Sequence, residues 1–131
     1  QETYVKPYAV NGSMQSIDND EIKRFFTQGS DMFNDLARFS VAGLSGQNVN
    51  IENIETFIDQ FQQWKSGAQS IVAALPEEAQ AEAQKFVTGM TGAALELEGY
   101  QQSLQDVKLW GIQQRLLESL LAYEGFINTL K

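Results

Sequence analysis

The stretch KFVTGMTGAALELEG (residues 85–99) decides the fold, because it combines the apolar period of a helix with three interior glycines. Its apolar residues recur at helical spacing and share one face: Phe86, Met90, Ala94 and Leu97. Gly89, Gly92 and Gly99 fall together on the flank beside that face. An interior glycine costs roughly 0.5–1 kcal/mol relative to alanine, so this helix must gain something from their small size.

The flank that carries these glycines also carries Glu96, and it has two interpretations. Bare backbone lets a neighbouring helix of the same bundle approach closely. It also leaves a shallow groove that can admit a ligand or a side chain of a partner protein. On the second interpretation, Gly89, Gly92 and Glu96 are candidate partner-binding residues.

Similar apolar periods on both sides of this stretch predict further helices. The predicted helices cover about residues 19–42, 51–75, 77–98 and 104–130. Pro76 separates the second from the third, and its fixed φ suits the first turn of a helix. SLQD (residues 103–106) has the spacing of a capping box and marks the start of the fourth. One continuous helix of about 50 residues from position 77 is the alternative to two separate helices.

Four helices of similar length, with no segment of strand period, predict an all-α, up-down-up-down four-helix bundle over residues 18–131. The length of 131 residues suits a single domain. Residues 1–17 contain Pro7 and the turn-like pair Asn11-Gly12 and have no helical period. We therefore expect an extended N-terminal arm before the bundle.

Composition excludes several classes of function. Nine basic residues stand against seventeen acidic ones, which gives a net charge of −8 and no basic stripe for nucleic acid or an anionic membrane. The chain has no histidine and no cysteine, so the haem and di-iron sites of other helical bundles have no ligands here. No apolar run approaches the roughly 20 residues of a transmembrane helix. We expect no metal, no cofactor and no transmembrane segment.

Catalytic motifs are also missing from the sequence. Glu96 and Glu98 lie on opposite sides of their helix, so they cannot act together on one substrate atom. The sequence contains neither a phosphate-binding glycine loop nor a GxSxG motif. We expect a protein without enzymatic activity and without catalytic residues.

The fourth predicted helix carries more apolar residues than one buried face requires. Its core stripe consists of Leu109, Ile112, Leu116, Leu120, Tyr123 and Ile127. Trp110, Leu117 and Leu121 form a second stripe beside the first. Either the N-terminal arm covers this second stripe, with Tyr4 and Tyr8 as anchors, or the stripe is an interface centred on the tryptophan.

These features favour a non-enzymatic acidic bundle that binds a protein partner or associates with itself, like an inhibitor, immunity or accessory protein. The sequence begins with Gln1, as after removal of a signal peptide, so we expect a periplasmic or extracellular location. One alternative is a carrier that holds a small apolar molecule in a cavity between aromatic-rich helices. Another is the ligand-sensing domain of a receptor.

Overall fold

The computed structural model describes residues 20–46 and 51–129, with side chains from Asn53 onward in the second range. These residues form five helical segments: α2 (Asp20–Leu44), α3 (Ile51–Ser66), α4 (Ala68–Ala73), α5 (Glu77–Ser103) and α6 (Asp106–Thr129). Within the described ranges there is no strand, and the predicted all-α bundle is confirmed. The predicted arm, residues 1–17, lies outside the described residues.

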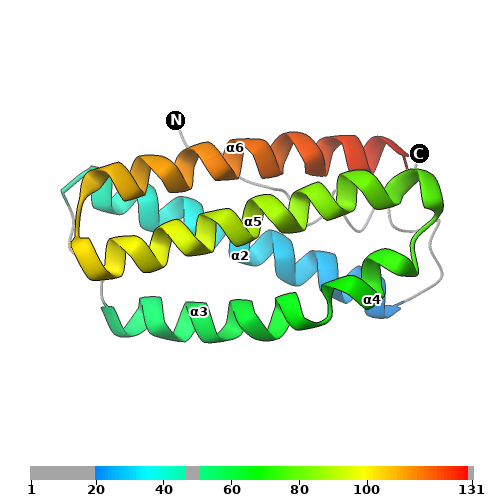
Figure 1. The fold of residues 1–131 in the computed structure, drawn as a ribbon, viewed down its shortest axis with the longest axis horizontal. Coiled ribbons are helices and arrows are strands. Elements are labelled where there is room, and N and C mark those ends of the chain that lie inside the picture. Colours follow the sequence, from blue (N-terminus) through cyan, green and yellow to red (C-terminus); the bar gives the residue numbers. More distant parts are fainter. Residues whose placement is uncertain (1–19, 47–50, 130–131) are drawn as a thin grey trace.

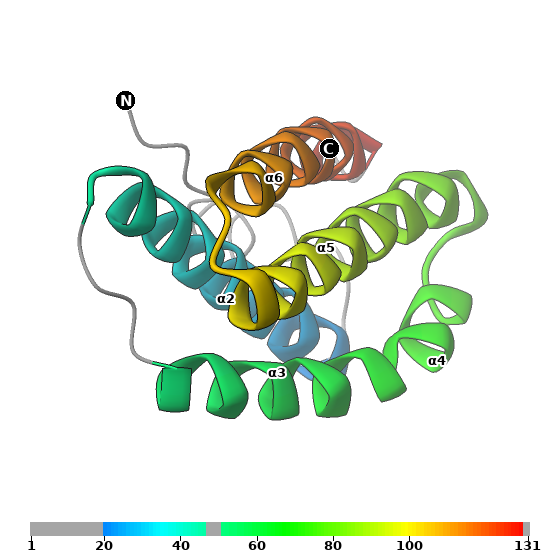
Figure 2. The ribbon, with the colours of Figure 1, turned by 60° about the vertical axis from the view of Figure 1, so that its left-hand side comes forward.

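Helices α2 and α5 occupy the middle of the molecule, with α6 on one side and α3 and α4 on the other (Figures 1 and 2). Helix α6 runs antiparallel to α2, because Phe26 meets Phe126 near one end while Gly43 meets Leu109 near the other. One face of α6 therefore rests on α2 and α5, and the opposite face points away from the bundle.

Helix α2 follows the predicted pattern closely. Its described first turn carries Asp20 and Glu21, which suits the positive end of the helix dipole. The residues that recur at steps of three and four along the helix are all buried: Ile22, Phe25, Phe26, Gly29, Phe33, Leu36 and Ser40. The helix extends to Leu44, two residues beyond the predicted end, and Gly46 follows with a φ of +84°.

The prediction of a single helix over residues 51–75 is wrong, because the chain breaks into α3 and α4 at Gly67. Gly67 has φ −92° and ψ −4°, and its N–H donates to the carbonyl of Trp64, three residues back, at 3.3 Å. This tight turn shifts the hydrogen-bonding pattern without moving the apolar face, since Trp64, Ala68 and Ile71 are all buried. The final turn ends at Ala73, before Pro76.

The third helix is longer than predicted: α5 runs through Gly99 and ends at Ser103 rather than at residue 98. Its first residues, Glu77 and Glu78, follow Pro76, which takes the N-cap position. Residues 104 and 105 then connect it to α6, so the two helices are separate and the continuous helix is excluded.

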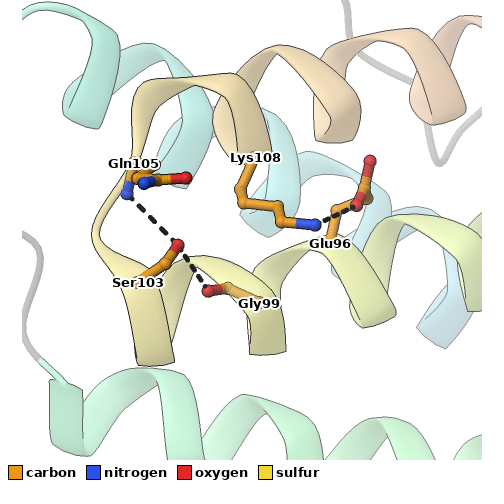
Figure 3. A network of polar contacts seen from close by, with 5 residues as sticks. All are labelled: Glu96, Gly99, Ser103, Gln105 and Lys108. Atoms are coloured by element: carbon orange, nitrogen blue, oxygen red, sulfur yellow. Dashed lines mark hydrogen bonds and ion pairs between the residues drawn. The ribbon is translucent and has the colours of Figure 1, made fainter.

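The capping-box prediction for residues 103–106 is also wrong. Ser103 is the last residue of α5, where its hydroxyl donates to the carbonyl of Gly99 at 2.9 Å and accepts from the N–H of Gln105 at 3.4 Å (Figure 3). The turn is made by Leu104, which has a left-handed φ of +56° and donates its N–H to the carbonyl of Tyr100 at 2.7 Å. The serine therefore closes the preceding helix, and α6 begins at Asp106 instead of residue 104.

Aromatic side chains from every long helix meet in one core. Phe25 stacks on Trp64 with ring centroids 4.4 Å apart, and Phe26 stacks on Phe126 at 4.6 Å. Trp64 also donates its indole N–H to the carbonyl of Phe25 at 2.8 Å, which joins α3 to α2. The phenylalanines that suggested a ligand cavity thus pack against other aromatic rings.

Candidate functional site

The glycine-bearing flank of α5 faces α6. A Cβ atom added to Gly89 would overlap Oγ of Ser119, and one added to Gly92 would lie 3.0 Å from Cδ of Arg115. A Cβ at Gly99 would lie 3.1 Å from Cε of Lys108. The neighbouring helix of the same bundle therefore fills the space that these glycines leave.

Helix α6 contributes glycines to the same contact. A Cβ on Gly111 would overlap Oε2 of Glu96, and one on Gly125 would lie 2.7 Å from Oε2 of Glu82. We call the five residues Gly89, Gly92, Gly99, Gly111 and Gly125 the glycine seam. The contact residues ascend along α5 as they descend along α6, and at each of these five contacts a side chain of one helix covers a glycine of the other.

Glu96 serves this contact as well. It lies over Gly111, and its Oε1 is 3.6 Å from Nζ of Lys108, which itself covers Gly99 (Figure 3). The Glu96–Lys108 ion pair and the contacts at Gly99 and Gly111 join the end of α5 to the start of α6. Gly89, Gly92 and Glu96, predicted as candidate partner-binding residues, thus contact α6 within the chain.

Gly111 and Gly125 were missed by the sequence reasoning. They are fourteen residues apart, which is two heptads, and this spacing keeps them on one face of α6. That regular spacing was the available signal. It becomes meaningful only when the register of α5 against α6 is known.

The opposite face of α6 carries the second apolar stripe, and its predicted members are exposed. Trp110 is 62% exposed, Leu117 53% and Leu121 61%. Val107, at 64%, extends the stripe by one turn. We call Val107, Trp110, Leu117 and Leu121 the outer stripe. Val107 was missed, although its spacing of three from Trp110 continues the pattern.

Two open hollows flank the outer stripe. On the α2 side, a hollow of about 470 Å³ is lined by Ala37, Gln113, Gln114 and Leu116 together with Trp110 and Leu117. On the α5 side, Leu121 borders a hollow of about 500 Å³ that also contains Lys85, Thr88 and Arg115. The stripe is therefore a ridge with room for side chains of a partner on both sides.

The inner face of α6 holds the buried polar groups of this region. Ser119 donates its hydroxyl to the carbonyl of Phe86 at 3.3 Å, and the hydroxyl of Tyr123 lies 3.5 Å from that of Ser30. Burial raises the pKa of Tyr123 to about 12, and the Ser30 hydroxyl opposes this effect. These buried groups join α6 to α5 and to α2.

Within the residues that the structure describes, no group of three or more acidic, cysteine or histidine side chains is arranged to hold a metal ion. Among the described helices, none has both the length and the apolar character needed to cross a membrane. Comparison with protein-family models, curated proteins and solved structures finds no match to this chain.

Proposed function

We propose that this chain is a non-enzymatic, protein-binding helical bundle, and that the outer stripe of α6 is its binding surface. The observation that supports this most strongly is the exposure of four large apolar side chains on one face of one helix. Each of the four is more than half exposed, so no described helix of the bundle covers them.

The composition of the stripe suits a protein interface. Large exposed apolar patches on a helix commonly mark association sites, and tryptophan is the residue most enriched among those that dominate binding energy. Trp110 lies between Val107 and Leu117 along the stripe, next to a hollow on the α2 side. A partner that covers the ridge would bury the indole and fill this hollow.

The proposal can be tested by photo-crosslinking in the native source, with p-benzoylphenylalanine in place of Leu117. We expect a covalent protein adduct at this position, because the side chain projects from the outer stripe. The matched control carries the same group in place of Gln62, an exposed residue of α3 on the other side of the molecule. A second change, Trp110→Asp, should abolish the adduct at position 117.

Mass spectrometry of the adduct identifies the partner. No adduct at position 117, or equal adducts at positions 117 and 62, would contradict the proposed binding surface. An adduct that contains only this chain, or one that contains a different protein, is consistent with it.

A further inference from the structure

We infer that the outer stripe binds the same stripe of a second copy of this chain, with the two α6 helices antiparallel about a two-fold axis beside Gln114. This inference rests on the proposed function of the stripe as a binding surface. It adds the identity of the partner and the register of the contact.

The outer stripe, together with Gln114 in the gap between Trp110 and Leu117, has the spacing of a coiled-coil seam. Val107, Trp110, Gln114, Leu117 and Leu121 follow one another at steps of three, four, three and four residues. Helix α6 already uses one such seam for the core, at Leu109, Ile112, Leu116, Ser119, Tyr123 and Phe126, all of which are buried. The outer stripe repeats this spacing on the opposite face, where another helix can pack.

The seam is complementary to itself when it is reversed. Val107 and Leu121 each lie seven residues from Gln114, and Trp110 and Leu117 lie four and three residues from it. An antiparallel copy therefore places Trp110 against Leu117 of the second copy and Val107 against Leu121 of the second copy. The two Gln114 side chains meet at the axis, where a polar pair within an apolar seam fixes the register.

The distribution of charge permits this contact in an acidic protein. The seam itself contains no charged residue, and its neighbours Arg115 and Glu118 form an ion pair with each other at 3.7 Å. Residues 107–131 contain three basic and two acidic side chains, whereas residues 76–106 contain one basic and six acidic. The α6 segment therefore repels a second copy less than the α5 segment would.

The size of the surface indicates a weak dimer. The four apolar side chains are each between 53% and 64% exposed. Since a whole aromatic side chain buries about 150–250 Å², their exposed parts amount to roughly 400 Å² per copy. With flanking atoms, the interface falls near the lower end of the roughly 1,200–2,000 Å² typical of stable complexes. We expect reversible association in the micromolar range.

Single-cysteine variants of the full chain test the inference cleanly, because the protein contains no cysteine. In a glutathione redox buffer at about 100 μM protein, Gln114→Cys should form a disulfide-linked dimer at least tenfold faster than the surface control Gln62→Cys. Val107→Cys and Leu121→Cys should each remain largely monomeric alone and form a mixed disulfide when they are combined.

Equal rates for Gln114→Cys and Gln62→Cys would overturn self-association through this stripe. Rapid dimerisation of Val107→Cys alone would overturn the antiparallel register, since a parallel pair brings identical residues together. If these variants fail while the photo-crosslink at Leu117 captures a different protein, this inference falls and the proposed function stands. If the photo-crosslink also fails, the proposed function falls as well.

Discussion

Among the three glycines that α5 contributes to the glycine seam, Gly89 approaches α6 most closely, and its neighbour there is Ser119. This pair shows how single residues stabilise the packing of α5 against α6. A Cβ on Gly89 would overlap Oγ of Ser119 and lie 3.2 Å from its backbone nitrogen. Ser119 is fully buried and donates its hydroxyl to the carbonyl of Phe86, so moving it away would break this hydrogen bond. The glycine therefore stabilises the fold by being small, which offsets its low helix propensity.

Gly89→Ala should lower the free energy of unfolding by about 1–3 kcal/mol, because overpacking outweighs the gain in helix propensity. Urea denaturation measures this change. The control is Gly67→Ala, where the nearest atom to the new Cβ is the carbonyl oxygen of Trp64 at 3.8 Å. The control should leave stability unchanged or raise it by up to about 1 kcal/mol.

In the double variant Gly89→Ala/Ser119→Gly, removal of the serine side chain makes room for the new methyl group. It should be less destabilised than the sum of its two single variants by more than about 0.5 kcal/mol. Additive effects would show that Gly89 and Ser119 do not depend on each other, contrary to the packing described above.

Tyr123 makes stability depend on pH at the alkaline end. Its pKa is about 12 in the folded protein and about 10 in an unfolded chain. Below pH 10 both states keep the proton and the contribution is fully present. Between pH 10 and 12 the unfolded state ionises first, so the free energy of unfolding should fall by up to about 3 kcal/mol.

Tyr123→Phe removes this ionisation and should be close to the wild type at pH 7, because Ser30 still donates to the carbonyl of Phe26 at 2.9 Å. Its advantage over the wild type should grow as the pH rises from 10 to 12. Urea denaturation across this range provides the comparison. Parallel pH profiles for the two proteins would contradict the raised pKa of Tyr123.

At the scale of helices and turns, the apolar period predicted which faces are buried but not where each helix ends. The period continues unchanged across Gly67, so nothing in it signals the break between α3 and α4. The turn after α5 could not be predicted from the sequence either. Its left-handed residue is Leu104, whereas glycine or asparagine usually occupies such a position. The seam partners Gly111 and Gly125 could not be assigned before this turn set the register of the hairpin.

Leu104→Gly should raise the free energy of unfolding by about 0.5–1 kcal/mol. Leucine is disfavoured at the left-handed φ of +56°, and its exposed side chain contributes little packing that would be lost. Thermal or urea unfolding measures the effect. Leu95→Gly makes the same change at an equally exposed site inside α5 and should destabilise by about 1 kcal/mol.

A loss of stability in both leucine variants would contradict the assigned conformation of the turn. An increase at position 104 with a loss at position 95 would show that glycine is favoured there because of the backbone.

At the scale of the whole molecule, one face of α6 packs against α2 and α5. The described buried side-chain nitrogen and oxygen atoms all have hydrogen-bond partners, which accounts for the polar groups inside the bundle. The outer stripe on the opposite face lies outside this internal packing. The second stripe was predicted from the sequence, and the exposure of Trp110, Leu117 and Leu121 required the positions of α2 and α5.

Because the outer stripe lies outside the core, Trp110→Asp should change the free energy of unfolding by no more than about 0.5 kcal/mol. Circular dichroism during urea denaturation provides the measurement. A loss of several kcal/mol would mean that the indole packs within its own chain, and that the stripe is part of the fold.

The central claim is that two copies associate through the outer stripe, and sedimentation equilibrium of the full chain tests it most directly. The wild type should rise from the monomer mass towards the dimer mass between about 1 and 300 μM. Trp110→Asp should stay monomeric, and Leu95→Asp, which alters an exposed leucine outside the stripe, should behave like the wild type. A wild type that remains monomeric throughout this range, or a Trp110→Asp variant that dimerises equally well, would contradict the claim.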